Sequence, residues 1–468
     1  MAATMPHVHI ISLPYHQDSA VWFLAIRHLP YPVWLDSGRP QSELGRYDIL
    51  VADPGLTLTT EGSQTRIQTK TSEEFSSADP FYLLSSYLAI RKDTEADLPF
   101  IGGAVGYWAY DLAWRLENLT RTNTQDIQLA DMQLGIYSWA IIQDHQQQTC
   151  VLMMNPTLDP AYNFSIILDI CRQKPMFHDL KQFIKIGNNL LKINKLESNI
   201  KANKYASLFS KVQSYIKAGD CYQINLAQRF SSTYQGDSFA AYLHLRDQLP
   251  SPFSAFMQWD EGSVLSFSPE RFLQVRGENI ETKPIKGTIA RGKTPAEDLQ
   301  NADWLQSSLK NRAENVMIVD LLRNDLSKHA TQVEVPYLCE LQSFANVHHL
   351  VSTVIGKLKA DSSPINLLRD AFPGGSITGA PKIRAMEIIE ELEPNQRSIY
   401  CGSIGYISVD GQMDTNIAIR TLVCDKKNIH CWGGGGIVAD SDGDKEYEET
   451  LAKVNLILKN MEEHFSGK

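Results

Sequence analysis

The stretch Ser263-Val-Leu-Ser-Phe-Ser-Pro-Glu-Arg-Phe-Leu-Gln-Val-Arg-Gly-Glu-Asn-Ile-Glu-Thr-Lys-Pro284 decides the fold. Three runs of strand-forming residues lie within it, at 263–268, 271–275 and 280–284, and only short turns separate them. No helix fits between these runs, so we expect the sheets to be largely antiparallel.

The same pattern continues in both directions along the chain. Further strands are expected at 47–52, 135–142, 348–355, 402–408, 418–423 and 430–432. Helices are expected at 205–217, 302–326, 381–392 and 445–459. The fold class is therefore α+β, with large and mostly antiparallel sheets.

Composition limits the function classes. The chain has 468 residues and a net charge of −10, which argues against nucleic acid or an anionic membrane as a partner. No apolar run approaches the ~18 residues of a membrane span. The seven cysteines are widely spaced and contain no CxxC pair, so we expect reduced thiols in a cytoplasm.

A shift in composition divides the chain. Lys, Asn, Gln and Ile dominate residues 174–203, which indicates a connector. It separates an N-terminal α/β region, 1–173, from a second region, 204–465. We expect the two regions to be interwoven rather than separate.

Lys286 stands in Pro284-Ile-Lys-Gly-Thr288, directly after the three strands. A lysine on a short rigid segment beside a glycine can act as a nucleophile if desolvation removes its proton. The alternative is a solvated turn lysine.

The expected last helix has two different faces. An apolar stripe is formed by Tyr447, Leu451, Val454 and Leu458. A second stripe, about 140° away at 100° per residue, carries Glu446, Glu449 and Lys453. The alternative for this charged stripe is a solvated face with one Glu–Lys pair.

Two glycine-rich segments are expected to be turns. Cys431-Trp-Gly-Gly-Gly-Gly-Ile-Val438 runs from a strand into a four-glycine turn, and Gly374-Gly-Ser-Ile-Thr-Gly-Ala-Pro-Lys382 opens a helix. Both can present backbone N–H groups to an anion. Neither fits a dinucleotide or P-loop fingerprint, so the pair suggests a ligand with carboxylates, the alternative being plain tight turns.

Two carboxylates are candidates for chemistry. Glu314 lies beside a buried apolar run, and with Glu449 it would supply oxygen ligands for Mg²⁺, the alternative being an ion pair with Arg312 or Arg323. Glu270 follows a strand and would act as a general acid if its pKa is raised, the alternative being an ion pair with Arg271.

Six motifs in order resemble those of the chorismate-utilising enzymes, a family that includes anthranilate, isochorismate and salicylate synthases. The motifs are Ser268-Pro-Glu, Pro284-Ile-Lys-Gly-Thr, Arg312-Ala-Glu-Asn with Asp320–Asp325, His349-Leu-Val-Ser, Gly379-Ala-Pro-Lys and the segment from Gly433 to Lys453. The resemblance implies a β-sandwich core of two antiparallel sheets with helices outside.

Within this family Lys286 marks the branch that aminates chorismate at C4, whereas anthranilate synthases carry Ala in this motif. The implied reaction converts chorismate and ammonia to 4-amino-4-deoxychorismate, the precursor of p-aminobenzoate and folate. The alternative is the large subunit of an anthranilate synthase.

The resemblance also implies roles for individual residues. Lys286 attacks C2 of chorismate and Glu270 protonates the departing C4 hydroxyl. Mg²⁺ is held by Glu314 and Glu449, with Glu446 as a ligand or just beyond. The chorismate pocket is lined by Gly287, His349, Ser376, Tyr400, Arg420, Gly434, Gly436 and Lys453.

Two further partners are implied. No glutamine amidotransferase signature occurs in the chain, so ammonia would come free or from a separate glutamine amidotransferase subunit. The N-terminal region resembles the part that binds tryptophan in relatives, the alternative being an empty packed pocket. The matching residues are Ser37, Leu44, Gly45, Arg46, Tyr47, Pro252, Phe253 and Ser254. One departure is Asn311, where some members of the family have Glu.

Overall fold

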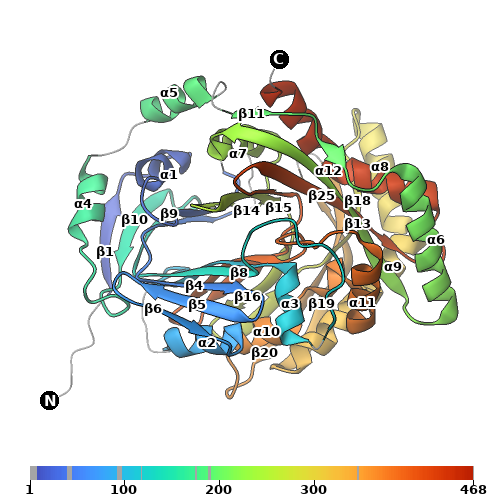
Figure 1. Ribbon diagram of the computed structural model, residues 1–468, viewed down its shortest axis with the longest axis horizontal. Coiled ribbons are helices and arrows are strands. Elements are labelled where there is room, and N and C mark those ends of the chain that lie inside the picture. Colours follow the sequence, from blue (N-terminus) through green and yellow to red (C-terminus); the bar gives the residue numbers. More distant parts are fainter. Residues whose placement is uncertain are drawn as a thin grey trace.

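The computed structural model describes residues 8–39, 45–91, 97–117, 119–173, 177–187, 191–344 and 347–466. Two large sheets face each other and helices cover them, so the expected α+β sandwich is confirmed (Figure 1). Every strand pair in these sheets, within the described ranges, is antiparallel, as the short turns between the strands predict.

Within the described residues, the first sheet has thirteen strands. Eleven lie in the order β1 (His9–Leu13), β10 (Thr149–Met154), β9 (Trp139–Asp144), β3 (Tyr47–Val51), β2 (Val33–Asp36), β14 (Phe253–Trp259), β15 (Gly262–Ser268), β24 (Thr421–Cys424), β25 (Asn428–Ile437), β13 (Gln223–Gly236) and β11 (Leu191–Ile193). Two short strands also pair with β13: β12 (Glu197–Ser198) and β21 (Gly379–Ala380).

The second sheet has twelve strands in the described part of the chain. Eleven lie in the order β18 (Ile285–Ala290), β20 (Val347–Leu358), β17 (Asn279–Thr282), β16 (Arg271–Arg276), β23 (Met413–Asn416), β22 (Ser403–Ser408), β7 (Gly103–Trp108), β8 (Met132–Tyr137), β4 (Leu56–Glu61), β5 (Gln64–Thr69) and β6 (Glu73–Ser76). The remaining strand, β19 (Ala330–Ser343), pairs with β20.

The helices lie outside the sheets. The α-helices are α1 (Ala20–Ile26), α2 (Pro80–Tyr87), α3 (Ala113–Leu116), α4 (Ser165–Arg172), α5 (Phe177–Gly187), α6 (Ala202–Ala218), α7 (Ser238–Gln248), α8 (Pro295–Ser307), α9 (Leu309–Ser327), α10 (Pro364–Ala371), α11 (Lys382–Leu392) and α12 (Gly443–Phe465). Two 3₁₀ turns are η1 (Tyr110–Leu112) and η2 (Gly375–Ile377). No helix in the described part of the chain is long and apolar enough to cross a membrane.

Alternation along the strands separates two cores. On β14, Ala255 and Met257 point into the core between the sheets, whereas Phe256 points to the opposite face. There it packs with Phe23 of α1 and Tyr242 of α7. In Figure 1, α1, α7 and α12 accordingly lie above β14, β15 and β25, and β4, β8 and β16 lie below those strands.

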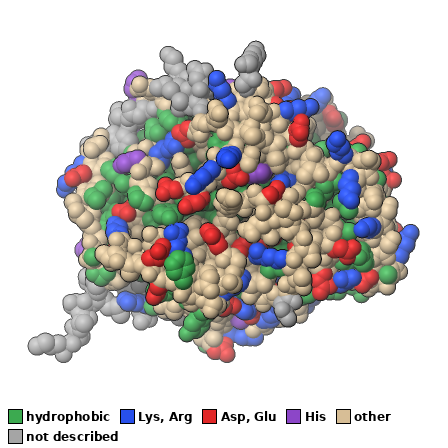
Figure 2. All heavy atoms as spheres, viewed as in Figure 1, with side chains coloured by type: hydrophobic (Ala, Val, Ile, Leu, Met, Phe, Trp, Pro, Cys, Tyr) green, Lys and Arg blue, Asp and Glu red, His purple; other side chains and the backbone are tan. Residues whose placement is uncertain are grey.

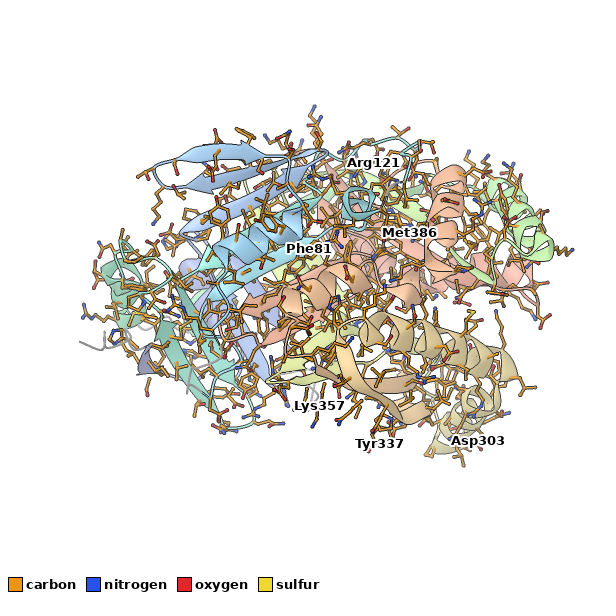
Figure 3. All side chains as sticks on the ribbon, turned by 90° about the horizontal axis from the view of Figure 1, so that it is seen from below. Phe81, Arg121, Asp303, Tyr337, Lys357 and Met386 are labelled. Carbon is orange, nitrogen blue, oxygen red and sulfur yellow. The ribbon has the colours of Figure 1, made fainter. Side chains whose placement is uncertain are left out.

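Strands that are distant in sequence lie side by side in both sheets. β2 pairs with β14, and β7 pairs with β22. In Figure 3, where the molecule is seen from below, Asp303 of α8 and Tyr337 of β19 lie well away from Phe81 of α2. Acidic and basic side chains are intermixed over the face drawn in Figure 2.

The single helix expected at 302–326 is wrong, because the segment forms α8 and α9 with a break at Ser308. Ser308 has extended backbone angles, and its hydroxyl accepts a hydrogen bond from the Asn311 N–H. Serine favours such a cap over the interior of a helix.

The expected end of the helix at 205–217 is confirmed, since α6 ends at Gly219 with φ +83°.

Asp111 of η1 fastens the N-terminal region to the loop that carries Tyr400. Its Oδ2 accepts a hydrogen bond from the Ser398 N–H at 2.6 Å. Burial, followed by the nearby Asp131 carboxylate, raises the pKa of Asp111 to about 8. The folded protein therefore keeps this proton at pH values where the unfolded chain has released it.

We expect Asp111→Asn to change the pH dependence of stability. The folded pKa is above the unfolded one, so the wild type loses stability as pH rises from about 4 through about 8, by about 4 kcal/mol between pH 5 and pH 8.5. The asparagine variant has no such proton and should not show this loss. Urea unfolding at pH 5 and pH 8.5 measures the difference. A gap between the two proteins that is equal at both pH values would contradict the assignment, and the exposed Asp303→Asn serves as the control.

Candidate active site

A β-bulge presents Lys286. Between Ile285, opposite Val351, and Thr288, opposite His349, two residues of β18 face one residue of β20. Gly287 takes φ +89° within this bulge, a conformation that favours glycine. The extra residue re-aims the side chain of Lys286, whose Nζ donates a hydrogen bond to the backbone oxygen of Ser376 at 2.7 Å.

Ser376 links Lys286 to Glu270. The Ser376 hydroxyl donates to Glu270 Oε1 at 2.7 Å, and the Glu270 side chain is 4% exposed. Arg271 pairs instead with Glu281 and Asp414, so the alternative of a Glu270–Arg271 ion pair is wrong. The lysine and the carboxyl group thus lie on either side of one serine.

The surroundings shift the pKa values of Glu270 and Lys286 in the directions that the predicted acid and nucleophile need. Burial raises the pKa of Glu270, although the Ser376 hydroxyl and the charge of Lys286 oppose the shift. Burial lowers the pKa of Lys286, although the carboxylates of Glu314 and Glu270 oppose it. Each shift favours the uncharged form, a protonated acid beside a neutral amine.

The four-glycine segment is a strand, so the expected turn and its run of free N–H groups are wrong. Gly433–Gly436 lie within β25 and pair with Ala227 and its neighbours on β13. A Cβ on Gly434 would come within 2.7 Å of the Tyr400 hydroxyl, and one on Gly436 within 2.2 Å of Gln223 Nε2. These two glycines share one face of the strand, and on the other face a Cβ on Gly433 would lie 2.1 Å from the backbone oxygen of Thr450, so glycine lets neighbouring groups approach the strand from both sides.

Three carboxylates approach this glycine strand. A Cβ on Gly435 would lie 3.2 Å from Glu446 Oε2 and 3.7 Å from Glu449 Oε1, and one on Gly436 would lie 3.7 Å from Glu314 Oε2. Among the residues that the structure describes, however, no three acidic side chains stand close enough to hold a metal ion as they are.

The expected faces of α12 need correction. The buried stripe runs through Glu446, Thr450, Val454, Ile457 and Met461, so Glu446 is buried and Tyr447 only half-buried. The pattern of apolar residues alone misplaces the buried side of α12, because polar residues on the side that faces the glycine strand are buried as well.

Lysines accompany the carboxylates. Lys453 Nζ lies 2.8 Å from Glu449 Oε1 and donates to the backbone oxygen of Gly434 at 2.8 Å. Burial works against ionisation of Glu449, but Lys453 outweighs it and the pKa of Glu449 is lowered. Burial raises the pKa of Glu314, which lies 3.8 Å from Lys310; its expected alternative partners, Arg312 and Arg323, are not involved.

Tyr400 and Arg420 are two further residues that the sequence predicts to line the chorismate pocket. The Tyr400 ring stacks on Trp432 with centroids 5.7 Å apart, and its loop is held by a buried ion pair of Arg397 with Glu393 at 2.6 Å. Within the described part of the chain, the Arg420 guanidinium makes no hydrogen bond and no ion pair with another side chain. Burial lowers its pKa.

His349 lies on β20 opposite Thr288. Its Nδ1 is 2.8 Å from Thr288 Oγ1. Burial and then the charge of Arg420 lower the pKa of His349 to about 3, so the ring is neutral at neutral pH. His348 bonds Ser343 and Asp298 instead, as expected for a neighbour that points to the other face of the strand.

Sequence reasoning missed several side chains in this region. Gln223 has a buried side-chain oxygen without a hydrogen-bond partner among the described residues, and it lies beside the glycine strand. The buried hydroxyl of Tyr205 likewise has no partner among them, and it lies near the Glu446 carboxylate. Lys310 forms an ion pair with Glu446. Its position just before the motif at Arg312–Asn315 was the feature of the sequence that could have identified it.

A cavity of about 270 Å³ lies between the two sheets. Leu44 lies outside the described residues, and the other residues expected to bind tryptophan all line this cavity: Ser37, Gly45, Arg46, Tyr47, Pro252, Phe253 and Ser254. Sequence reasoning missed the opposite wall, which includes Arg271, Tyr406 and Asp414.

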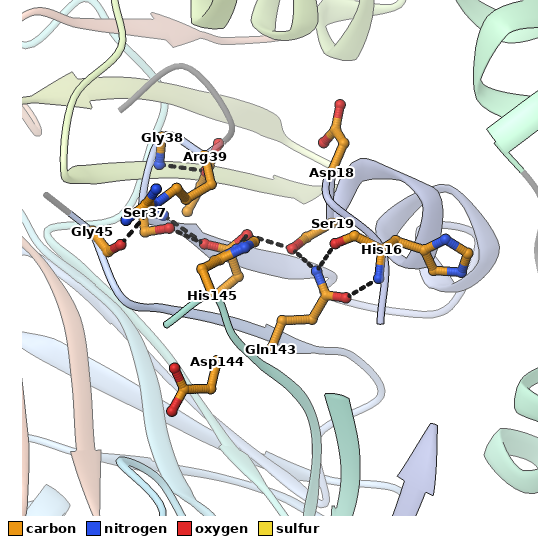
Figure 4. A network of polar contacts seen from close by, with 12 residues as sticks. His16, Asp18, Ser19, Ser37, Gly38, Arg39, Gly45, Gln143, Asp144 and His145 are labelled. Carbon is orange, nitrogen blue, oxygen red and sulfur yellow. Dashed lines mark hydrogen bonds and ion pairs between the residues drawn. The ribbon is translucent and has the colours of Figure 1, made fainter. Parts of the chain in front are cut away.

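A buried polar network supports the Ser37 side of this cavity (Figure 4). Asp48 Oδ1 accepts hydrogen bonds from the Ser37 N–H at 2.7 Å and the Ser37 hydroxyl at 2.6 Å, while Oδ2 contacts His145 at 2.9 Å and Ser19. Burial opposes ionisation of Asp48, but these bonds outweigh it and lower its pKa. Gln143 extends the network through Ser19.

The chain belongs to the chorismate binding enzyme family, whose profile matches residues 31–459. It is 45% identical to aminodeoxychorismate synthase component 1 of Escherichia coli (strain K12), over 97% of this chain and 98% of that protein. Anthranilate synthase component 1 of Geobacillus stearothermophilus is 34% identical, over 92% and 88%. The crystal structure of anthranilate synthase component I from Streptococcus pneumoniae TIGR4 matches with a TM-score of 0.77 at 29% identity, covering 89% of this chain and 93% of that one.

Proposed function

We propose that this enzyme aminates chorismate at C4 with ammonia and forms 4-amino-4-deoxychorismate for p-aminobenzoate and folate synthesis. One observation carries the proposal: Lys286 on its bulge shares Ser376 with the buried acid Glu270, through bonds of 2.7 Å each. The 45% identity to a protein named aminodeoxychorismate synthase component 1 supports it.

The proposed chemistry uses two displacements. The neutral amine of Lys286 forms a bond to C2, the ring diene shifts, and the C4–oxygen bond breaks as Glu270 protonates the departing hydroxyl to water. Ammonia then bonds to C4, the diene shifts back, and the C2–Nζ bond breaks to release Lys286. Chorismate and ammonia thus give the amino product and water, with the substituent still at C4.

The substrate carboxylates need cationic partners. Arg420, without a partner among the described side chains, and Lys453 would meet the enolpyruvyl carboxylate beside Gly434–Gly436. Neutral His349, Gly287, Ser376 and Tyr400 would complete the pocket.

The residues present fit Mg²⁺. The donor set is all carboxylate, which this ion prefers, and Glu446 Oε2 is buried without a hydrogen-bond partner among the described residues. Glu314 and Glu449 would hold the ion, with Glu446 as a third ligand or next to it. Bound Mg²⁺ would hold the ring carboxylate and polarise the substrate.

We also propose the partners. Ammonia would come from a glutamine amidotransferase subunit, which accords with the designation "component 1" of the relatives. The seven buried free thiols favour a cytoplasmic location.

Tryptophan would occupy the cavity beside Ser37; calorimetric titration with tryptophan tests this, and the lack of any heat at millimolar ligand would contradict it.

Product identification tests the main proposal. Chorismate, Mg²⁺ and an ammonium salt are incubated with the chain, and the products are separated and identified by mass. We expect 4-amino-4-deoxychorismate. Fluorescent anthranilate as the main product would instead assign the chain to the ortho-aminating branch and overturn the proposal.

A further inference from the structure

Lys310 stands in the first turn of α9 and reaches the carboxylates described above. Its Nζ lies 2.7 Å from Glu446 Oε1 and 3.8 Å from Glu314 Oε1. The side chain of Lys310 is 39% exposed, whereas that of Glu446 is 2% exposed. The partly exposed lysine therefore neutralises a carboxylate that cannot reach solvent.

Glu446 depends on this lysine. Its Oε1 accepts from Lys310 and from the Ser441 hydroxyl at 2.6 Å, while Oε2 has no hydrogen-bond partner among the described residues. Removing the cationic partner of a buried carboxylate is strongly unfavourable. Lys310 is thus the nearest compensating charge when no metal ion is bound.

Three carboxylates and three lysines share the cluster. Lys310 lies against Glu446 and Glu314, Lys453 lies against Glu449, and burial favours the uncharged form of Lys286. Of the three lysines, Lys310 alone makes no hydrogen bond to a backbone oxygen of the site, in contrast to Lys286 and Lys453, within the described ranges.

We propose that Lys310 is an internal counter-ion that competes with the divalent cation for Glu446 and Glu314. The inference rests on the metal site in the proposed function. An ammonium at 2.7 Å from Glu446 fills the space that Mg²⁺ would need to reach that carboxylate at about 2.1 Å. When Mg²⁺ binds, the carboxylates close on it and the flexible, half-exposed lysine turns out to solvent.

Replacing Lys310 with Met tests the competition, because Met keeps the length of the side chain without its charge. We expect the dissociation constant for Mg²⁺, titrated calorimetrically without chorismate, to fall about tenfold. The gain in melting temperature on adding saturating Mg²⁺ should exceed that of the wild type, because the metal-free variant lacks its counter-ion. Lys310→Arg keeps the charge and should bind Mg²⁺ no more tightly than the wild type.

Controls separate this inference from the metal site itself. Lys293→Gln removes an exposed positive charge ahead of α8 and should leave both measurements unchanged, while Glu449→Gln should abolish the Mg²⁺ heat. If neither the wild type nor Lys310→Met binds Mg²⁺, the metal site and the inference both fail. If the wild type binds Mg²⁺ and Lys310→Met binds it equally or more weakly, only the inference is overturned. A Lys310→Met protein that folds only with Mg²⁺ supports it.

Discussion

Lys286→Ala is expected to lower the rate of aminodeoxychorismate formation by about 10³-fold or more, because the variant lacks the atom that bonds to C2. Chorismate should still bind, since Arg420 and Lys453 are untouched and alanine fits the bulge without disturbing Gly287. Initial rates with chorismate, Mg²⁺ and ammonium, together with calorimetric binding of chorismate, measure the two effects separately.

Lys283→Ala is the matched control for this experiment. It removes the same type of side chain three residues upstream, where Lys283 Nζ lies 3.4 Å from Glu281 and outside the bulge. The control should keep its rate within about twofold, as surface ion pairs contribute little. Rates near those of the wild type in Lys286→Ala would show that ammonia attacks chorismate directly and would remove the covalent step.

Glu270→Gln is expected to lower the rate by about 10²- to 10⁴-fold, the usual contribution of a general acid. Glutamine keeps the size of the side chain and can accept the Ser376 bond, but it has no proton to give to the leaving hydroxyl. The loss should fall on kcat, with little change in KM for chorismate.

The pH profile of Glu270→Gln distinguishes acid catalysis from a structural role. The wild-type rate at constant free ammonia requires neutral Lys286 and protonated Glu270, so it rises and then falls with pH. The residual rate of the variant depends only on the loss of the lysine proton, so it should rise with pH and level off. An alkaline fall that survives in the variant would exclude Glu270, and the exposed Glu261→Gln should behave as the wild type.

The strands were predictable from local sequence pattern, but which strands pair with one another was not. Alternating strand residues with short turns predicted antiparallel pairing, which the structure shows for β14 with β15 and for β16 with β17, whereas the consecutive strands β15 and β16 lie in different sheets. Nothing in the sequence shows that β2 lies beside β14, because such pairing depends on packing across more than two hundred residues. Ser308 could have signalled the break between α8 and α9, since serine favours helix caps.

The site was predicted from residue types and family motifs, and its geometry was not. The structure brings Lys286, Ser376 and Glu270 into one chain of contacts. The glycines of β25 were misjudged because a run of glycine predicts a turn, whereas here it serves close approach of Glu446 and Tyr400 to a backbone. Lys310 was missed because pairing between α9 and α12 is tertiary.

The late position of β25 and α12 in the chain has a consequence for synthesis on the ribosome. β25 lies in the interior of the first sheet, between β24 and β13, although it begins only at Asn428. Neither the sheet nor the carboxylate cluster can therefore form until β25 and α12 have emerged. Earlier strands remain with unpaired edges, a state prone to aggregation, so we expect the nascent chain to need chaperone protection until these two elements are available.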